Sequence, residues 1–152
     1  MKYSFLAIIA VLFMSCSDKD AEEPVDFSEK NEAEIKAYIA DNKLDAHRTD
    51  SGLYYVVSTE GTGKQPTNTS NVTVVYKGYF TDGTVFDQSS ESGVSFGLQQ
   101  VIKGWAEGIT YLKEGGSGIL LIPSHLGYGS YNYYGIPGGS VLIFEVDLIS
   151  VN

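Results

Sequence analysis

Arginine is almost absent from the chain: Arg48 is the only one among its 152 residues, so residues 51–152 contain none. Recognition of nucleic acid depends on positive charge, and above all on the arginine fork that grips phosphate and guanine. The chain instead has a formal net charge of −9 at pH 7. Nucleic acid is therefore not an expected partner.

Cysteine and histidine are scarce as well. Cys16 is the only cysteine, and the two histidines, His47 and His125, have neither a cysteine partner nor the spacing of a metal-binding motif. The phosphate-binding loops GxGxxG and GxxxxGK[ST] do not occur, and the stretch GGSGI leads into a predicted strand rather than a nucleophile elbow. We therefore expect neither a metal nor a cofactor.

The single cysteine stands at the end of an apolar N-terminal run, MKYSFLAIIAVLFMSC. This run is too short to span a bilayer but fits the apolar part of a secretory signal, so residues 1–15 are predicted to be a signal peptide. FMSC resembles a bacterial lipoprotein box, which implies lipidation of Cys16. The expected location is the cell envelope, anchored to the outer membrane on its periplasmic face or at the cell surface. The alternative is an ordinary signal peptide with an incidental cysteine.

Residues 16–27 include the acidic stretch SDKDAEEPVD, which is charged, contains a proline and shows no apolar period. We interpret this segment as a lipid-anchored acidic spacer. Acidic residues directly after the cysteine also resemble the surface-export signals of lipoproteins in the Bacteroidetes lineage. A plain solvated tether is the alternative interpretation.

Glycine is missing from the first third of the chain, since all 17 glycines lie at or after Gly52. This shift predicts a domain boundary near residue 50, preceded by an N-terminal helical extension over residues 28–50. Asp26 has the capping-box spacing to Glu29, and apolar residues recur at helical spacing behind it: Ile35, Tyr38 and Ile39. The helix is expected to end near residues 42–43. Its narrow stripe is predicted to pack on the main domain or on a second copy, forming a homodimer.

From residue 51 the apolar period becomes that of strands. LYYVVST, VTVVYKGYF, GILLIP and VLIFEVDLISV are rich in Val, Ile, Tyr and Phe and bounded by turn residues. Asp82-Gly83 predicts a two-residue hairpin turn. Trp105, Ile109 and Leu112 recur at helical spacing and predict one short helix beginning near Ile102. The predicted fold class is α+β: an antiparallel sheet with one helix laid across one face.

This segment is rich in aromatic residues and poor in catalytic polar groups, and one reaction suits that balance. Rotation about an X–Pro bond breaks no covalent bond, but amide resonance sets a barrier of roughly 18–20 kcal/mol. The twisted transition state is less polar than the planar ground state, so a dry aromatic pocket favours it relative to water. Lowering the barrier by about 5–7 kcal/mol speeds rotation roughly 10⁴–10⁵-fold.

Four segments together resemble the FKBP-type peptidyl-prolyl cis-trans isomerases in order and spacing: VVYKGYFTDGTVFDQS, VIKGWAEGI, IPSHLGYG and GIPGGSVLIFEVDLI. The resemblance covers residues 51–152, the predicted isomerase domain. It implies an FKBP-like antiparallel sheet of five to six strands wrapped around one short helix. It also implies isomerase activity on X-Pro-containing unfolded or exported polypeptides, and affinity for macrolides of the FK506 type.

The resemblance further implies a binding pocket. The residues expected to be catalytic are Tyr76, Phe86, Asp87, Ile102, Trp105, Tyr128 and Phe144. Trp105 is expected to form the pocket floor, and the backbone N–H of Ile102 to donate to a substrate carbonyl. Val94, Val101 and Ile136 are expected to contact the substrate, with Val94 standing where the family usually has an aromatic residue.

Two features depart from the family pattern. The family often has an arginine shortly after the Phe-Asp pair that holds the carboxylate, but QSSESGVS has none. The histidine often found in the last loop is replaced by the tyrosines of GYGSYNYYGIPGG, residues 127–139, where we expect ligand preference to differ. Two other hypotheses stay open: a non-catalytic polypeptide-binding chaperone (holdase) that uses the same pocket, and a carbohydrate binder that uses exposed tyrosines.

Overall fold

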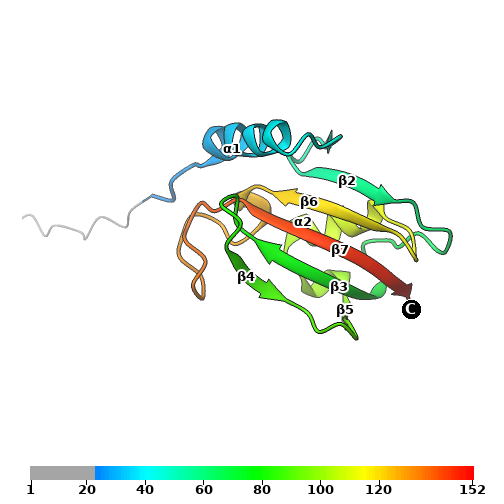
Figure 1. The fold of residues 1–152 in the computed structure, drawn as a ribbon. Helices are drawn as coiled ribbons and strands as arrows, with labels where there is room; N and C mark the ends of the chain where they lie inside the picture. The colour runs from blue at the N-terminus through cyan, green and yellow to red at the C-terminus, as the bar shows by residue number, and fades with distance from the viewer. Residues whose placement is uncertain (1–22) are drawn as a thin grey trace, which may run out of the picture.

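The chain folds into one antiparallel sheet with a helix packed on each of its faces (Figure 1). The computed structural model describes residues 23–152, so the predicted signal peptide, the lipidation at Cys16 and most of the spacer lie outside the described residues. The strands are β1 (His47–Arg48), β2 (Tyr54–Thr59), β3 (Asn71–Tyr79), β4 (Val85–Gln88), β5 (Val94–Gly97), β6 (Ser117–Ile122) and β7 (Leu142–Val151). The helices are α1 (Ser28–Asp41) and α2 (Lys103–Gly108), with short 3₁₀ helices at η1 (Leu98–Gln100), η2 (Ile109–Tyr111) and η3 (Ser124–Leu126).

The sheet has seven strands in the order β1-β2-β6-β7-β3-β4, with β5 also paired to β3. The four long stretches predicted from the strand period are β2, β3, β6 and β7. The expected antiparallel sheet with one short helix laid across one face is confirmed. Its shortest strand, β1, has only two residues, too few to carry a period. β1 pairs with β2, so the N-terminal extension continues into the sheet.

Two neighbouring rows of side chains divide the sheet into its two faces. Tyr79, Ile143, Leu121 and Tyr54 lie opposite one another across four strands. The next row contains Phe144 and Leu120, which point to the other face because successive side chains on a strand alternate. The first row belongs to the cluster under α1, and the second to the main core under α2.

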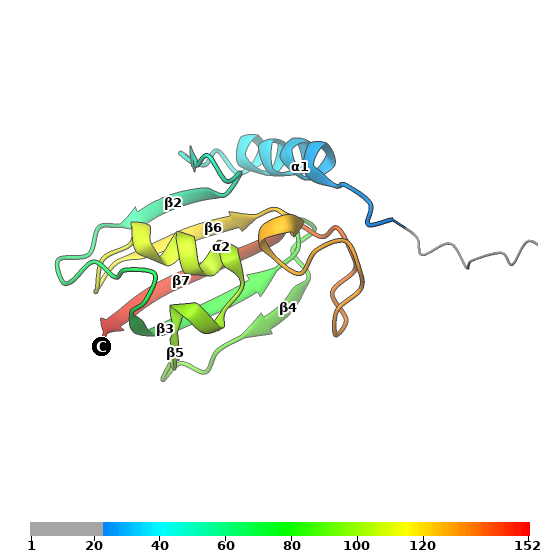
Figure 2. The ribbon, with the colours of Figure 1, turned by 180° about the vertical axis from the view of Figure 1, so that it is seen from behind.

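The helix α2 lies across one face of the sheet (Figure 2), and two of its glycines bring its backbone close to β6. A Cβ atom on Gly104 would lie 2.5 Å from Ile122, and one on Gly108 would lie 2.6 Å from Leu120. These two glycines therefore let the helix backbone rest directly on β6. This close approach holds Trp105, which is 4% exposed, against the sheet.

The helix α1 packs on the opposite face through the stripe expected from the sequence. Ile35 is fully buried, and Tyr38 and Ile39 pack beside it against Tyr79 and Leu121. The apolar stripe of α1 therefore packs on the sheet of its own chain. A homodimer through this helix stays a prediction, and its contacts would have to come from the outer side of α1. No helix among residues 23–152 has the length and apolar character needed to cross a membrane.

The two ends of α1 differ in how well the sequence predicted them. The predicted capping box is wrong: Phe27 is the N-cap, and the Asp26 carboxylate accepts a hydrogen bond from the Ser28 N–H at 2.9 Å. The predicted end is confirmed, because Lys43 adopts a positive φ of 52° and the Leu44 N–H returns to the Ile39 carbonyl at 3.0 Å.

The β3–β4 hairpin forms as predicted, but with a different turn. The Gly83 N–H donates to the Phe80 carbonyl, and the Phe80 N–H donates to the Thr84 carbonyl, so three residues rather than two form the loop. Gly83 has a φ of 86°, which a type I turn followed by a bulge requires at this position. The Asp82 carboxylate fixes the turn by accepting from the Thr84 N–H at 2.8 Å.

Candidate active site

A cavity of about 450 Å³ opens on the α2 side of the sheet. Its lining residues come from β3, β4, β5, α2 with the turn before it, the 127–139 loop and β7: Tyr76, Asp87, Phe96, Gln100, Val101, Ile102, Trp105, Tyr128, Tyr133 and Phe144. Segments far apart in the sequence thus converge on one site. Most of the lining is aromatic or aliphatic.

Trp105 forms the floor of the cavity. Its ring meets those of Tyr76 and Phe144 edge to face, both with centroids 5.1 Å away, and that of Phe96 at 5.3 Å. Such edge-to-face contacts stabilise aromatic clusters beyond their buried area. The floor is therefore rigid and apolar.

A second layer of rings supports the wall formed by Phe144. Phe86 packs edge to face on Phe144 with centroids 5.4 Å apart. Gly78 on β3 makes room for both, because a Cβ there would lie 2.7 Å from Phe144 and 2.9 Å from Phe86. The glycine in the middle of VVYKGYF is thus required by the rings behind the cavity.

Polar groups occupy one side of the cavity. The Tyr76 hydroxyl donates a hydrogen bond of 2.6 Å to the Asp87 carboxylate. Burial, reinforced by this bond and by the negative charge of Asp87, raises the pKa of Tyr76 well above its ordinary value. Burial, with smaller effects from Tyr133 and Asp87, also raises the pKa of Tyr128. Both phenols therefore stay protonated and able to donate at neutral pH.

Tyr76 orients Asp87 in this chain, which has no arginine shortly after the Phe-Asp pair. Within the described part of the chain, no ion pair involves this carboxylate. Its geometry therefore comes from a neutral donor on the neighbouring strand β3.

Two donors at the cavity have no partner of their own. Ile102 is the N-cap of α2, and no hydrogen bond among residues 23–152 uses its N–H or the hydroxyl of Tyr128. The first N–H groups of a helix have no partner within the helix. Both donors are available to a ligand that enters the cavity.

The structure brings most of the expected site residues together and separates three. Tyr76, Asp87, Val101, Ile102, Trp105, Tyr128 and Phe144 line the cavity. Phe86 and Ile136 line an adjoining groove instead. Val94, on β5, lines neither: it pairs with Val74 on β3 and is 40% exposed, and its contact with substrate stays a prediction.

Phe96, Gln100 and Tyr133 are lining residues that the sequence did not assign. Phe96 lies two residues after Val94 on the same side of β5, and its ring reaches Trp105. The alternation of side chains along a strand shows that Val94 and Phe96 share a face. It does not show which of the two residues lies over α2. Gln100 directly precedes the expected pair Val101 and Ile102, and this position in the sequence was the one indication that Gln100 lines the cavity.

The 127–139 loop has a defined shape. The Gly139 N–H donates to the Gly129 carbonyl at 2.9 Å, which closes the base of the loop. Near the tip, Tyr133 and Ile136 exchange two backbone hydrogen bonds of 2.9 and 2.8 Å. Tyr128 and Tyr133 stack with ring centroids 4.7 Å apart. The loop backbone and the stacked rings of Tyr128 and Tyr133 therefore have a defined arrangement.

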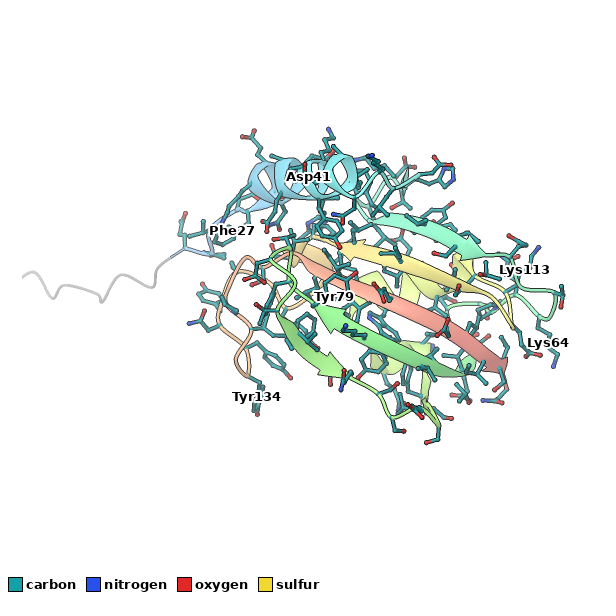
Figure 3. The ribbon with its side chains drawn as sticks, in the orientation of Figure 1. Phe27, Asp41, Lys64, Tyr79, Lys113 and Tyr134 are labelled. Atoms are coloured by element: carbon teal, nitrogen blue, oxygen red, sulfur yellow. The ribbon has the colours of Figure 1, made fainter. Side chains whose placement is uncertain are left out.

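The helix α1 holds this loop at its base. Asn31 is fully buried; its amide nitrogen donates to the Gly139 carbonyl, and its amide oxygen accepts from the Ser124 N–H, both at 2.8 Å. The ring of Phe27, labelled in Figure 3, packs directly on Gly139. We call these contacts the Asn31 clamp.

Fold and cavity together define an α+β domain with a ring-lined site for an apolar ligand. The profile of the FKBP-type peptidyl-prolyl cis-trans isomerase family matches residues 62–149. The isomerase FkpA of Buchnera aphidicola (from Baizongia pistaciae) is 45% identical over 111 residues, covering 72% of this chain and 44% of its own. FkpA of Aeromonas hydrophila is 40% identical over 139 residues, covering 89% of this chain and 49% of its own. The crystal structure of FkpA from Escherichia coli is similar, with a TM-score of 0.74 and 37% identity over 82% of this chain and 61% of that one.

The chain belongs to the FKBP-type peptidyl-prolyl cis-trans isomerase family. It spans about half the length of the curated relatives that it matches.

Proposed function

We propose that the protein catalyses cis-trans isomerisation of X–Pro bonds in unfolded or exported polypeptides. The observation that carries this proposal is the Trp105 floor with its surrounding rings, flanked by two donors that no other group of residues 23–152 bonds. This cavity combines an apolar surface for a proline ring with donors for the carbonyl groups on either side of it.

The chemistry follows from the change in polarity during rotation. As the amide twists, its nitrogen loses conjugation and its carbonyl oxygen loses negative charge, so water stabilises the twisted state less than the planar one. A ring-lined cavity removes that water, while the Ile102 N–H and the Tyr128 hydroxyl hold flanking carbonyl groups. Positioning and desolvation are sufficient because no covalent bond breaks.

We expect wild-type protein to accelerate isomerisation of an Ala-Pro peptide, and Phe86→Ala and Tyr128→Ala to slow it. Loss of the Phe86 ring that supports the Phe144 wall, or of the Tyr128 donor, each worth about 1–2 kcal/mol, lowers kcat/KM roughly 5- to 30-fold. The measurement is a protease-coupled assay, normalised to the folded fraction. Ile149→Ala is the control, because Ile149 is 51% exposed at the far end of β7. Equal activity of all four proteins would show that the cavity is not the active site.

The alternative is a holdase that grips proline-containing segments in the same cavity without accelerating rotation. Trp105 is the only tryptophan in the chain, so its fluorescence reports occupancy of the cavity directly. Peptide binding with no acceleration above the uncatalysed rate would favour the holdase. A macrolide of the FK506 type, the further ligand that the family suggests, serves as competitor in both measurements.

We also propose that the mature protein is anchored to the outer membrane through lipid on Cys16, on the periplasmic face or at the cell surface. The support is the lipoprotein box after an apolar signal. In an expressing bacterium, Cys16→Ser is expected to abolish incorporation of labelled fatty acid and to move the protein from the membrane to the soluble fraction. Ser17→Ala, next to the cysteine, is expected to label like the wild type. Label that persists in Cys16→Ser would exclude this anchor.

A further inference from the structure

Tyr128 lines the cavity from a backbone that has little rigidity of its own. Gly127 and Gly129 stand on either side of it, and glycine has more conformational freedom than any other residue. Gly129 uses this freedom, with a φ of 82°. The ring of Tyr128 stacks on Tyr133, which belongs to the same loop. The direction of the Tyr128 hydroxyl therefore depends on what holds the two glycines.

Three backbone hydrogen bonds hold these glycines. The Ser124 carbonyl accepts from the N–H of Gly127 at 3.0 Å and from the N–H of Gly129 at 2.8 Å. The Gly139 N–H donates to the Gly129 carbonyl at 2.9 Å. Both polar backbone groups of Gly129 are thus bonded, one to Ser124 and the other to Gly139.

The side chain of Asn31 binds both of these holding residues. Its amide oxygen accepts from the Ser124 N–H, and its amide nitrogen donates to the Gly139 carbonyl. One planar amide supplies both the donor and the acceptor. It therefore connects to the Gly129 N–H through Ser124 and to the Gly129 carbonyl through Gly139.

This connection is buried in a way that docking of α1 does not require. Asn31 and Ser124 are the two buried residues with polar, non-aromatic side chains among residues 23–152. The contact of α1 with the sheet comes from the apolar stripe around Ile35. Burying an amide costs free energy unless its hydrogen bonds are made, and a fully bonded buried group specifies one arrangement of its partners. The partners of Asn31 are the segments on either side of the 127–139 loop, so the arrangement that it specifies is that of the loop.

We propose that Asn31 is a positioning residue of the active site: through Ser124 and Gly139 it holds Tyr128 with its hydroxyl directed into the cavity. The inference rests on the proposed function and deepens it, because it assigns part of the active-site support to α1. That helix lies outside residues 62–149, which the family profile matches. Tyr128 contacts the substrate, and Asn31 acts only through Tyr128.

A double-mutant cycle tests the connection. Tyr128→Phe removes only the hydroxyl and is expected to lower kcat/KM for an Ala-Pro peptide about fivefold, as loss of one hydrogen bond does. Asn31→Ala, normalised to the folded fraction, is expected to lower it about three- to fivefold. The double variant is expected to lose no more than Tyr128→Phe, because a hydroxyl that is absent cannot be misplaced. Independent effects would multiply to roughly 15- to 25-fold.

Asn31→Asp tests the same connection in a protein that keeps the shape of the side chain. A protonated carboxyl group can replace both bonds of the amide, whereas a carboxylate can only accept. Because burial raises the pKa of such a group, the ratio of variant to wild-type kcat/KM is expected to be near one at about pH 5 and to fall several-fold by about pH 8. In the Tyr128→Phe background this fall is expected to disappear. Exchange NMR of the peptide, which needs no protease, measures the rates at each pH. Asn42→Asp, at the exposed end of α1, is the control, and its ratio is expected to stay constant.

Each outcome bears on one proposal. Independent effects of Asn31→Ala and Tyr128→Phe, or a ratio for Asn31→Asp that does not change with pH, overturn the positioning role, while wild-type activity upholds the proposed function. Failure of wild type to accelerate any peptide overturns the proposed function instead. The same cycle, taken from dissociation constants of the peptide read by Trp105 fluorescence, then decides whether Asn31 acts through Tyr128.

Discussion

Replacing Asn31 with alanine is expected to destabilise the folded chain by about 3–5 kcal/mol, because each buried backbone group left unpaired costs about 1–3 kcal/mol. The two groups are the Ser124 N–H and the Gly139 carbonyl, both in buried residues. In the Asn31→Ala protein, no other side chain of α1 could reach these two groups. Chemical denaturation gives the change in free energy of unfolding.

The matched control is Asn42→Ala at the other end of α1. Asn42 also bonds a backbone carbonyl, that of Tyr38, but on the exposed surface. Its loss is expected to cost less than about 1 kcal/mol, because water replaces the lost bond. Hydrogen exchange provides a second readout: Asn31→Ala should lower protection at the base of the 127–139 loop. Wild-type protection there would show that Asn31 supports the helix only.

Trp105→Ala is expected to reduce kcat/KM at least roughly 100-fold in the folded protein, because it removes the cavity floor and admits water. The same change is expected to cost about 3–5 kcal/mol of stability, as truncation of a buried tryptophan does. Activity must therefore be measured at low temperature, with the folded fraction checked by circular dichroism. Trp105→Phe keeps a ring and is expected to retain activity within about tenfold of the wild type.

Leu112→Ala separates the loss of stability from the loss of the floor. Leu112 is 1% exposed in the same core cluster but does not line the cavity. Its truncation is expected to cost about 2–5 kcal/mol while the folded fraction keeps wild-type kcat/KM. If Leu112→Ala and Trp105→Ala lost activity in equal measure, Trp105 would be a core residue and not the floor of the site.

The fold was predictable wherever apolar residues repeat over a long stretch. β7 could be recognised because Phe144, Val146 and Leu148 alternate with exposed Glu145 and Asp147. β1 and β5 could not, since two and four residues carry no period and exist only through pairing with β2 and β3. The capping box failed because a three-residue spacing does not determine which residue leaves the helical conformation first.

The cavity was predictable from motifs, whereas its support was not. Segments such as VIKGW keep their place relative to the sheet, so Ile102 and Trp105 lie where the family resemblance implied. The Asn31 clamp has no comparable signal. Its bonds go to backbone groups 93 and 108 positions away, and backbone groups are not specified by side-chain identity. The adjoining groove, which Phe86 and Ile136 line, depends likewise on how two loops meet.

The hydrogen bond that closes the 127–139 loop has a consequence for how this chain can vary. The side chains of Ile143 and Phe144 point to opposite faces of the sheet. One residue inserted in β7 would therefore turn the side chains that pack under α1 toward the cavity, and those that line the cavity toward α1. The two ends of the loop segment, Gly129 and Gly139, are instead fixed to each other, and Gly139 is also fixed to α1. We therefore expect the sheet beneath to tolerate changes of length and side chain in the segment between them, except at Ile136, which packs against the main core.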